Sequence, residues 1–124
     1  MTLSELYGLI GGDYEKATSV LRMEKLIDKH IRKFTSSGVV EAVIAAGESM
    51  DGEKIFEAAH AMKGVTANLG LTSLCEKASA LCEEFRPGNE KKLSDEEVKK
   101  LIRETEELYR RTAESIDAYA ASQG

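Results

Sequence analysis

The sequence predicts an all-α protein: an antiparallel four-helix bundle with short N-terminal helices packed at one end. Apolar residues recur every three or four positions along most of the chain, which is the period of an α-helix. Residues that cap or end helices separate these stretches, and no stretch shows the apolar-polar alternation of a strand. The connection at Gly70 is short, which favours antiparallel neighbours. The length fits one domain, residues 1–124.

Two short helices open the chain. Thr2 can cap the first, and Gly11 with Gly12 ends it, because glycine adopts the left-handed backbone conformation at little cost. Asp13 can cap the second. We expect residues 1–22 to form a helical lid that closes one end of the bundle.

The first helix of the bundle is predicted from an apolar stripe that starts at Met23 and runs to Phe34. The next four residues, 35–38, favour caps and turns, and the helical pattern resumes over residues 39–48. The pattern leaves open whether Ser36 to Gly38 marks a kink or a break between two helices.

The next two helices form a pair. Asp51 can cap the first of them and Gly70 ends it. The second opens at Leu71 or Thr72 and stops before Pro87, which cannot continue a helix. Because the connection at Gly70 is short, the two helices should be antiparallel neighbours.

The last helix is predicted to be the longest. Ser94 and Glu97 form a capping box, in which each side chain accepts a hydrogen bond from the backbone N–H of the other residue. The apolar period then continues to Ala121, about 40 Å at 1.5 Å per residue. The bundle is therefore expected to span residues 23–121.

The charge and hydropathy of the chain exclude several classes of partner. Seventeen Lys and Arg residues against 22 Asp and Glu residues give a net charge of −5, which provides no electrostatic basis for binding nucleic acid or an anionic membrane. No apolar run is long enough to span a bilayer, and the N-terminus lacks the pattern of a signal peptide. We expect a cytoplasmic protein with no nucleic-acid and no membrane partner.

The cysteines and histidines do not indicate a metal or redox site. Cys75 and Cys82 lie seven residues apart on one predicted helix, about 10 Å along its axis, which is too far for a disulfide. They are interpreted as buried thiols. Two Cys and two His without metal-ligand spacing predict no metal site.

The stretch from residue 56 to residue 70, FEAAHAMKGVTANLG, carries the strongest functional signal. A helical projection places one set of residues on the core side, opposite His60: Ile55, Ala58, Met62, Val65, Thr66 and Leu69. His60 is therefore expected to point outward. Its neighbours on the outer face are predicted to be Phe56, Lys63, Gly64 and Ala67.

These residue types suit phosphoryl transfer, which needs an aligned nucleophile and positive charge near the phosphate oxygens. A neutral imidazole at His60 is a nucleophile, and Lys63 can attract the phosphate without bonding to it covalently. Gly64 costs a helix about 1 kcal/mol relative to Ala, which indicates close approach by another surface. The alternative is that His60 and Lys63 are ordinary exposed helix residues.

The motif H-x-x-K-G-x5-G, formed by His60, Lys63, Gly64 and Gly70, resembles the phosphorylation motif of histidine-containing phosphotransfer (HPt) domains of the stand-alone bacterial type. The chain departs from the family pattern at Ala61 and Val65, where the family often has a hydroxyl or a smaller residue. The resemblance implies that His60 is phosphorylated, that Lys63 supports the phosphate, and that the chain is a relay in a two-component phosphorelay.

The same resemblance implies response-regulator receiver domains as partners, with a hybrid sensor kinase as a further one. The donor and acceptor would be receiver aspartates, with Mg²⁺ held by the receiver and no cofactor on this chain, which we expect to be a monomer. Phe56, Gly64, Ala67 and Asn68 are the candidate docking residues. Two of these have an alternative, since Asn68 could be a helix-surface amide and Phe56 an edge of the core.

Other readings remain open for the domain as a whole. The chain has no glycine-rich ATP loop and no kinase motif, so we expect a phosphoryl carrier without ATP-dependent kinase activity. The main alternative function is a helical module that docks receiver domains without transferring phosphate, and a purely structural domain is a further one. His30 is interpreted as structural or merely exposed. Acidic groups such as Glu83 with Glu84 are interpreted as solvated faces or helix N-terminal charges.

Overall fold

The structure, a computed structural model, describes residues 1–123, and every regular element in this range is a helix. The all-α prediction is therefore confirmed. The last residue of the predicted domain, Gly124, lies outside the described residues. The helices are α1 (Leu3–Leu9), α2 (Tyr14–Leu21), α3 (Glu24–Phe34), α4 (Val39–Ser49), α5 (Gly52–Asn68), α6 (Thr72–Phe85) and α7 (Asp95–Ser122).

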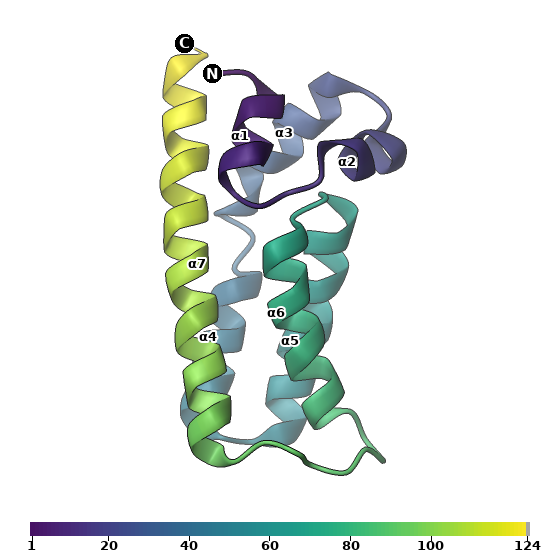
Figure 1. Cartoon of the computed structure of the whole chain (residues 1–124), viewed down its shortest axis with the longest axis vertical. Coiled ribbons are helices and arrows are strands. Elements are labelled where there is room, and N and C mark those ends of the chain that lie inside the picture. The colour runs from purple at the N-terminus through teal and green to yellow at the C-terminus, as the bar shows by residue number, and fades with distance from the viewer. Residues whose placement is uncertain (124) are drawn as a thin grey trace.

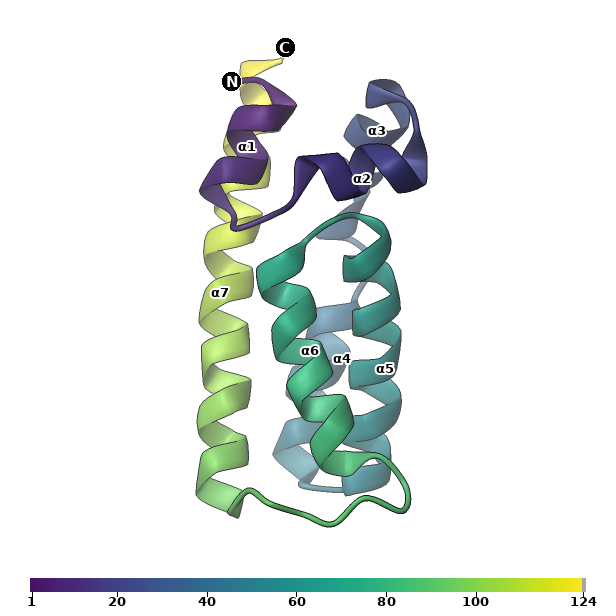
Figure 2. The same ribbon diagram turned by 45° about the vertical axis from the view of Figure 1, so that its right-hand side comes forward.

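Figure 1 shows α4, α5, α6 and α7 side by side along the long axis of the molecule, and Figure 2 shows the same grouping after a turn of 45°. Helix α5 packs against α4 and α6, and α7 packs against the same two helices. Helices α1, α2 and α3 gather at the end where α5 passes into α6. Both described ends of the chain lie at this end of the molecule.

The core is built from apolar side chains that each helix contributes to the interior. Fully buried examples come from six of the helices: Leu6, Ile27, Ile31, Val43, Ile55, Met62, Leu74, Leu81, Val98 and Ile116. Burying one such side chain contributes about 1.5 to 3 kcal/mol to folding. Because α5 is packed from two sides, its rotation about its own axis is fixed, and so is the face that it turns to solvent.

The segment at residues 35–38 is a break between two helices, which settles the alternative that the sequence left open. Helix α3 ends at Phe34, and α4 begins at Val39 after Gly38, whose φ of 76° lies in the left-handed region. The Ser37 hydroxyl donates a hydrogen bond to the Phe34 carbonyl at 2.6 Å, which ends α3.

Met23 does not belong to the buried stripe, and that prediction is wrong. It is the N-cap of α3 with extended backbone, and 56% of it is exposed. The buried face of α3 starts one turn later, at Ile27. The apolar spacing was correct, but a residue that precedes the first helical turn does not share the orientation of that turn.

The predicted caps are confirmed for four helices. Thr2, Asp13, Asp51 and Ser94 each accept a hydrogen bond from a backbone N–H in the first turn that follows. The Ser94 cap is the predicted capping box with Glu97.

The interpretation of Glu84 as a solvated residue is wrong. Glu84 is only 6% exposed, and its carboxylate accepts hydrogen bonds from the backbone N–H groups of Lys92 and Leu93, each at 3.1 Å. The loop between α6 and α7 leaves these N–H groups without helical partners, and the Glu84 carboxylate satisfies them in a partly buried position. Glu84 thus ties the loop to α6 and is not part of a solvated face.

The N-terminal helices are held to the turn between α5 and α6 by hydrogen bonds. The Tyr7 hydroxyl donates to the carbonyl of Leu69 at 2.6 Å in a buried position, and this burial raises the pKa of the phenol. The Ser73 hydroxyl donates to the carbonyl of Gly11 at 2.9 Å. The predicted lid therefore packs on the turn that ends the helix carrying His60.

Both the backbone conformation and the close neighbours at position 70 require a glycine. Gly70 has a φ of 69°, its carbonyl accepts a hydrogen bond from the N–H of Asp13 at 2.7 Å, and an added Cβ would run into the carbonyl oxygen of Asp13. Gly70→Ala should therefore destabilise the fold by about 2 to 5 kcal/mol, the sum of a left-handed non-glycine residue and an overpacked contact.

Gly38→Ala is the matched control for that prediction. Gly38 has a similar φ of 76°, but nothing lies within 4 Å of an added Cβ, so only the conformational cost of about 1 to 2 kcal/mol should appear. Urea unfolding of both variants measures the difference. Equal losses would show that contact with α2 adds nothing at Gly70.

Candidate functional site

Helix α5 carries the candidate site, and a side-chain cap defines where the helix begins. The Asp51 side chain accepts hydrogen bonds from the backbone N–H groups of Glu53 at 3.1 Å and Lys54 at 3.4 Å. Inside the helix, the buried Thr66 hydroxyl donates to the carbonyl of Met62 at 2.7 Å, so no polar atom is left unpaired there.

The buried face of α5 is rotated from the one that the sequence predicted. Ala59 is fully buried, whereas Ala58 and Val65 are only partly buried. The reason is that α5 packs between α4 and α6, so the buried sector is centred near Ile55. At about 100° per residue, Gly64 lies directly opposite Ile55 and His60 lies about 40° to one side.

His60 is exposed, as predicted, and it stacks on an aromatic ring of the same helix. The centroids of the His60 and Phe56 rings are 5.7 Å apart and the ring planes are inclined by 22°. The Arg86 guanidinium carbon lies 5.6 Å from the Phe56 centroid, in a cation–π contact. One row of three side chains thus connects the end of α6 with the imidazole.

Arg86 is a candidate site residue that the sequence analysis did not identify, because only the neighbouring Pro87 was considered there, as a helix breaker. A signal was available. In an antiparallel pair, residues at similar separations from the connecting turn lie side by side. Phe56 and Arg86 are 14 and 16 residues from Gly70, which would have paired them.

Lys63 lies one turn after His60 and is partly buried against α6, where its carbonyl oxygen is 3.9 Å from the Cys75 sulfur. Burial raises the pKa of the neighbouring Cys82 thiol, and the positive charges of Lys63 and Arg86 oppose that rise. Both cations are therefore close to this part of α6. Within residues 1–123, no carboxylate forms an ion pair with Lys63.

The surface next to His60 is open at Gly64, where an added Cβ would meet no atom within 4 Å. Ala67 is partly buried and Asn68 is exposed. Asn68 lies on the side of α5 that faces α3, where a hollow of about 280 Å³ is lined by four apolar and four polar side chains. The lining residues are Leu21, His30, Lys33, Phe34, Ser37, Val65, Asn68 and Leu69.

His30 is exposed on α3, in agreement with one of its two interpretations. It lines the hollow beside Asn68 and belongs to a different helix from His60. The outer face of α5 thus carries His60, whereas His30 lines a hollow that does not include His60.

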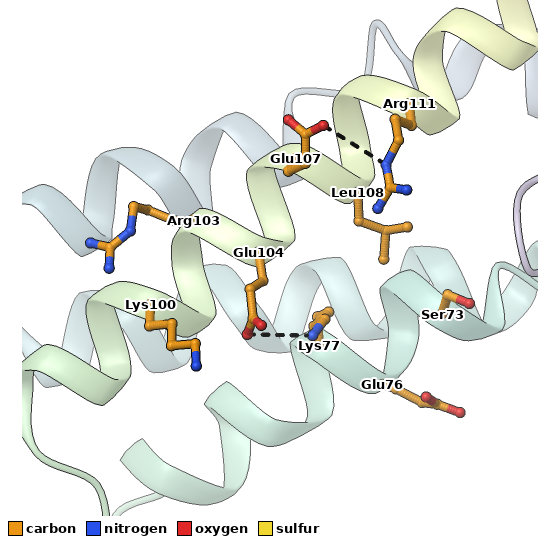
Figure 3. Close-up of a pocket in the computed structure, with 9 residues that line it drawn as sticks. All are labelled: Ser73, Glu76, Lys77, Lys100, Arg103, Glu104, Glu107, Leu108 and Arg111. Carbon is orange, nitrogen blue, oxygen red and sulfur yellow. Dashed lines mark ion pairs between the residues drawn. The ribbon is translucent and has the colours of Figure 1, made fainter.

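A larger hollow, of about 550 Å³, lies between α6 and α7 and includes none of the predicted site residues. Figure 3 shows its side chains, among which Lys77 pairs with Glu104 at 3.7 Å and Arg111 with Glu107 at 3.9 Å. These cations are partly neutralised by adjacent carboxylates. The size of a hollow therefore does not locate the candidate site in this molecule.

The cysteines are free thiols, with Cys82 buried and Cys75 partly buried. Across residues 1–123, no cluster of three or more His, Cys, Asp or Glu side chains is arranged to hold a metal ion. In the same range, none of the helices is both long enough and apolar enough to cross a membrane.

Comparison with known families gives a match to the family model of the Hpt domain over residues 21–118. No curated protein and no solved structure matches the chain. The matched range covers α3 to α6 and most of α7, and it includes His60, Lys63 and Arg86. The first twenty residues, with α1 and most of α2, precede it.

Proposed function

The chain belongs to the Hpt domain family, and we propose that it relays a phosphoryl group between receiver-domain aspartates with His60 as the carrier. Membership of this family implies histidine phosphotransfer in phosphorelays and interaction with receiver domains. The observation that supports His60 as the carrier is its exposed imidazole beside the open surface at Gly64.

In the proposed reaction, the unprotonated ring nitrogen of His60 attacks the phosphorus of a receiver aspartyl phosphate. The N–P bond forms as the P–O bond to the aspartate breaks, and the carboxylate leaves with the electron pair. The other ring nitrogen then releases its proton to water. A second receiver aspartate reverses these steps. In-line attack requires the reacting atoms to approach to about 3 to 3.5 Å.

The outer face of α5 is the proposed docking surface, formed by Gly64, Ala67 and Asn68. A receiver that approaches this face meets a glycine beside the nucleophile, so its own loops can come close to the imidazole. We assign the Mg²⁺ of the reaction to the receiver. We further propose that the protein is a cytoplasmic monomer. Residues 23–121 would then act as one antiparallel four-helix bundle, with α3 and α4 together as its first member.

A direct test uses a panel of purified receiver domains charged with radiolabelled acetyl phosphate and freed of excess reagent. Label should move to this chain and be acid-labile and alkali-stable, as expected for phosphohistidine. Incubation with labelled ATP and Mg²⁺ alone should leave the chain unlabelled. If receivers bind the chain but transfer no label to it, the carrier function is wrong, and the chain is a docking module for receiver domains.

Lys63→Ala should slow transfer about tenfold and shorten the lifetime of the phosphohistidine, without abolishing the label. This corresponds to a loss of about 1.4 kcal/mol of electrostatic support. Lys54→Ala is the control, because Lys54 is an exposed lysine on the same helix but on the side away from Lys63. Rapid-quench kinetics measure both variants. Unchanged rates in Lys63→Ala would show that the Lys63 charge does not support the phosphate.

A further inference from the structure

The row of side chains formed by Arg86, Phe56 and His60 has a role beyond docking. We propose that Phe56 is a positioning residue for the nucleophile: its ring holds the His60 imidazole, and Arg86 holds the ring. The inference rests on the proposed function, since a held imidazole matters only if His60 reacts. It gives Phe56 a role that neither the docking nor the core-edge interpretation contains.

The geometry fits an offset stack. Phe56 and His60 are four residues apart on α5, a spacing at which side chains on a helix meet. A centroid separation of 5.7 Å with planes inclined by 22° lies within the range of favourable aromatic pairs. An exposed histidine without such a contact rotates among several rotamers. The stack therefore restricts the directions in which the imidazole can point.

Stacking also suits the chemistry of attack. The lone pair of an imidazole nitrogen lies in the plane of the ring, so a neighbour that covers a face of the ring leaves the reacting edge free. Phe56 covers a face of His60, and the surface at Gly64 stays open for the donor. The ring is thus held without being blocked, which is the condition for a preorganised nucleophile.

Arg86 fixes the Phe56 ring from a second helix. Its guanidinium lies over the ring at 5.6 Å and pairs with Glu83 at 3.0 Å. Its backbone is the C-cap of α6 and precedes Pro87, so α6 sets where the side chain starts. The orientation of the imidazole is therefore determined by α5 and α6 together.

The test compares Phe56→Leu with wild type by proton NMR and by transfer kinetics. The His60 ring protons should lose the upfield shift caused by the Phe56 ring and move toward the positions of the His30 protons. His30 makes no aromatic stack within the described residues, so it is the internal reference. The maximal transfer rate should fall about three- to tenfold, because misplacement of a reacting group costs rate.

The concentration of receiver that gives half the maximal rate separates positioning from docking. It should stay at its wild-type value in Phe56→Leu, while Phe56→Tyr, which keeps the ring, should restore both the chemical shifts and the rate. Arg86→Lys keeps the charge but loses the planar contact, so it should lower the rate in the same way. A rise in the half-saturating concentration alone would make Phe56 a docking residue and overturn the proposal.

The two proposals fail separately. Unchanged His60 shifts in Phe56→Leu would disprove the stack, whatever the outcome with labelled receivers. An unlabelled wild-type chain would disprove the relay, while the NMR comparison, which needs no phosphate, would still report on the stack. Circular dichroism of each variant checks that the helices remain.

Discussion

His60→Gln should abolish labelling by charged receivers and leave the fold intact. Glutamine provides no ring nitrogen that can form the N–P bond, so transfer should fall below detection. His60 is exposed, and its replacement leaves no cavity in the core. The loss of its stack on Phe56 should cost no more than about 1 kcal/mol of unfolding free energy.

His30→Gln is the matched control, since His30 is also exposed and belongs to α3. It should retain label at the wild-type level. Binding of an uncharged receiver to His60→Gln should also persist, because an exposed amide does not close the docking surface. If label survives in His60→Gln, or disappears in His30→Gln, the assignment of His60 as the phosphorylated residue is wrong.

The features that the sequence predicted well are local ones. Asp51 caps α5, Gly70 ends it, and Ser94 pairs with Glu97, because each of these depends on residues within one or two turns. The exposure of His60 followed from the apolar spacing of the same helix. A helix start, a helix stop and one outward face could all be derived without knowledge of the neighbouring helices.

The features that sequence reasoning missed depend on contacts between elements. Ala59 is buried because α5 packs against two helices, which shifts the centre of its buried face. Glu84 is buried because a loop several residues away needs an acceptor. Arg86 reaches Phe56 only because the chain reverses at Gly70. The helical period in the sequence does not determine which helix covers which side.

The corrected orientation of α5 gives Gly64 a more central place in the proposed docking surface. Because Gly64 lies directly opposite the buried sector and His60 lies to one side of it, a partner centred on the outer face of α5 meets Gly64 first. Gly64 then lies at the centre of the contact with the partner, and the His60 imidazole lies at the edge of that contact. Substitutions at Gly64 should therefore affect docking more than their small effect on folding would suggest.

Gly64→Ala should stabilise the protein by about 0.5 to 1 kcal/mol, which raises the melting temperature by about 2 to 4 °C. Gly64 lies inside α5, and a Cβ added there meets no atom within 4 Å, so the helix gains propensity without a clash. Gly8 is the matched control, as a helical glycine of α1 whose added Cβ is equally unobstructed. Gly8→Ala should be stabilising by a similar amount.

Phosphotransfer should respond in the opposite direction at Gly64 and not at all at Gly8. A receiver has to bring its aspartyl phosphate to about 3 to 3.5 Å from the imidazole, and a side chain at Gly64 holds the two surfaces apart. Transfer should fall severalfold in Gly64→Ala and about a hundredfold or more in Gly64→Gln, since a displacement of about 1 Å costs that much. Gly8→Gln should transfer at the wild-type rate, which excludes a general effect of glutamine on a helical glycine. Rapid-quench kinetics with charged receivers, together with thermal unfolding of the same variants, measure both effects. A wild-type transfer rate in Gly64→Gln would show that receivers do not dock on the outer face of α5, because no receiver could then be resting on Gly64.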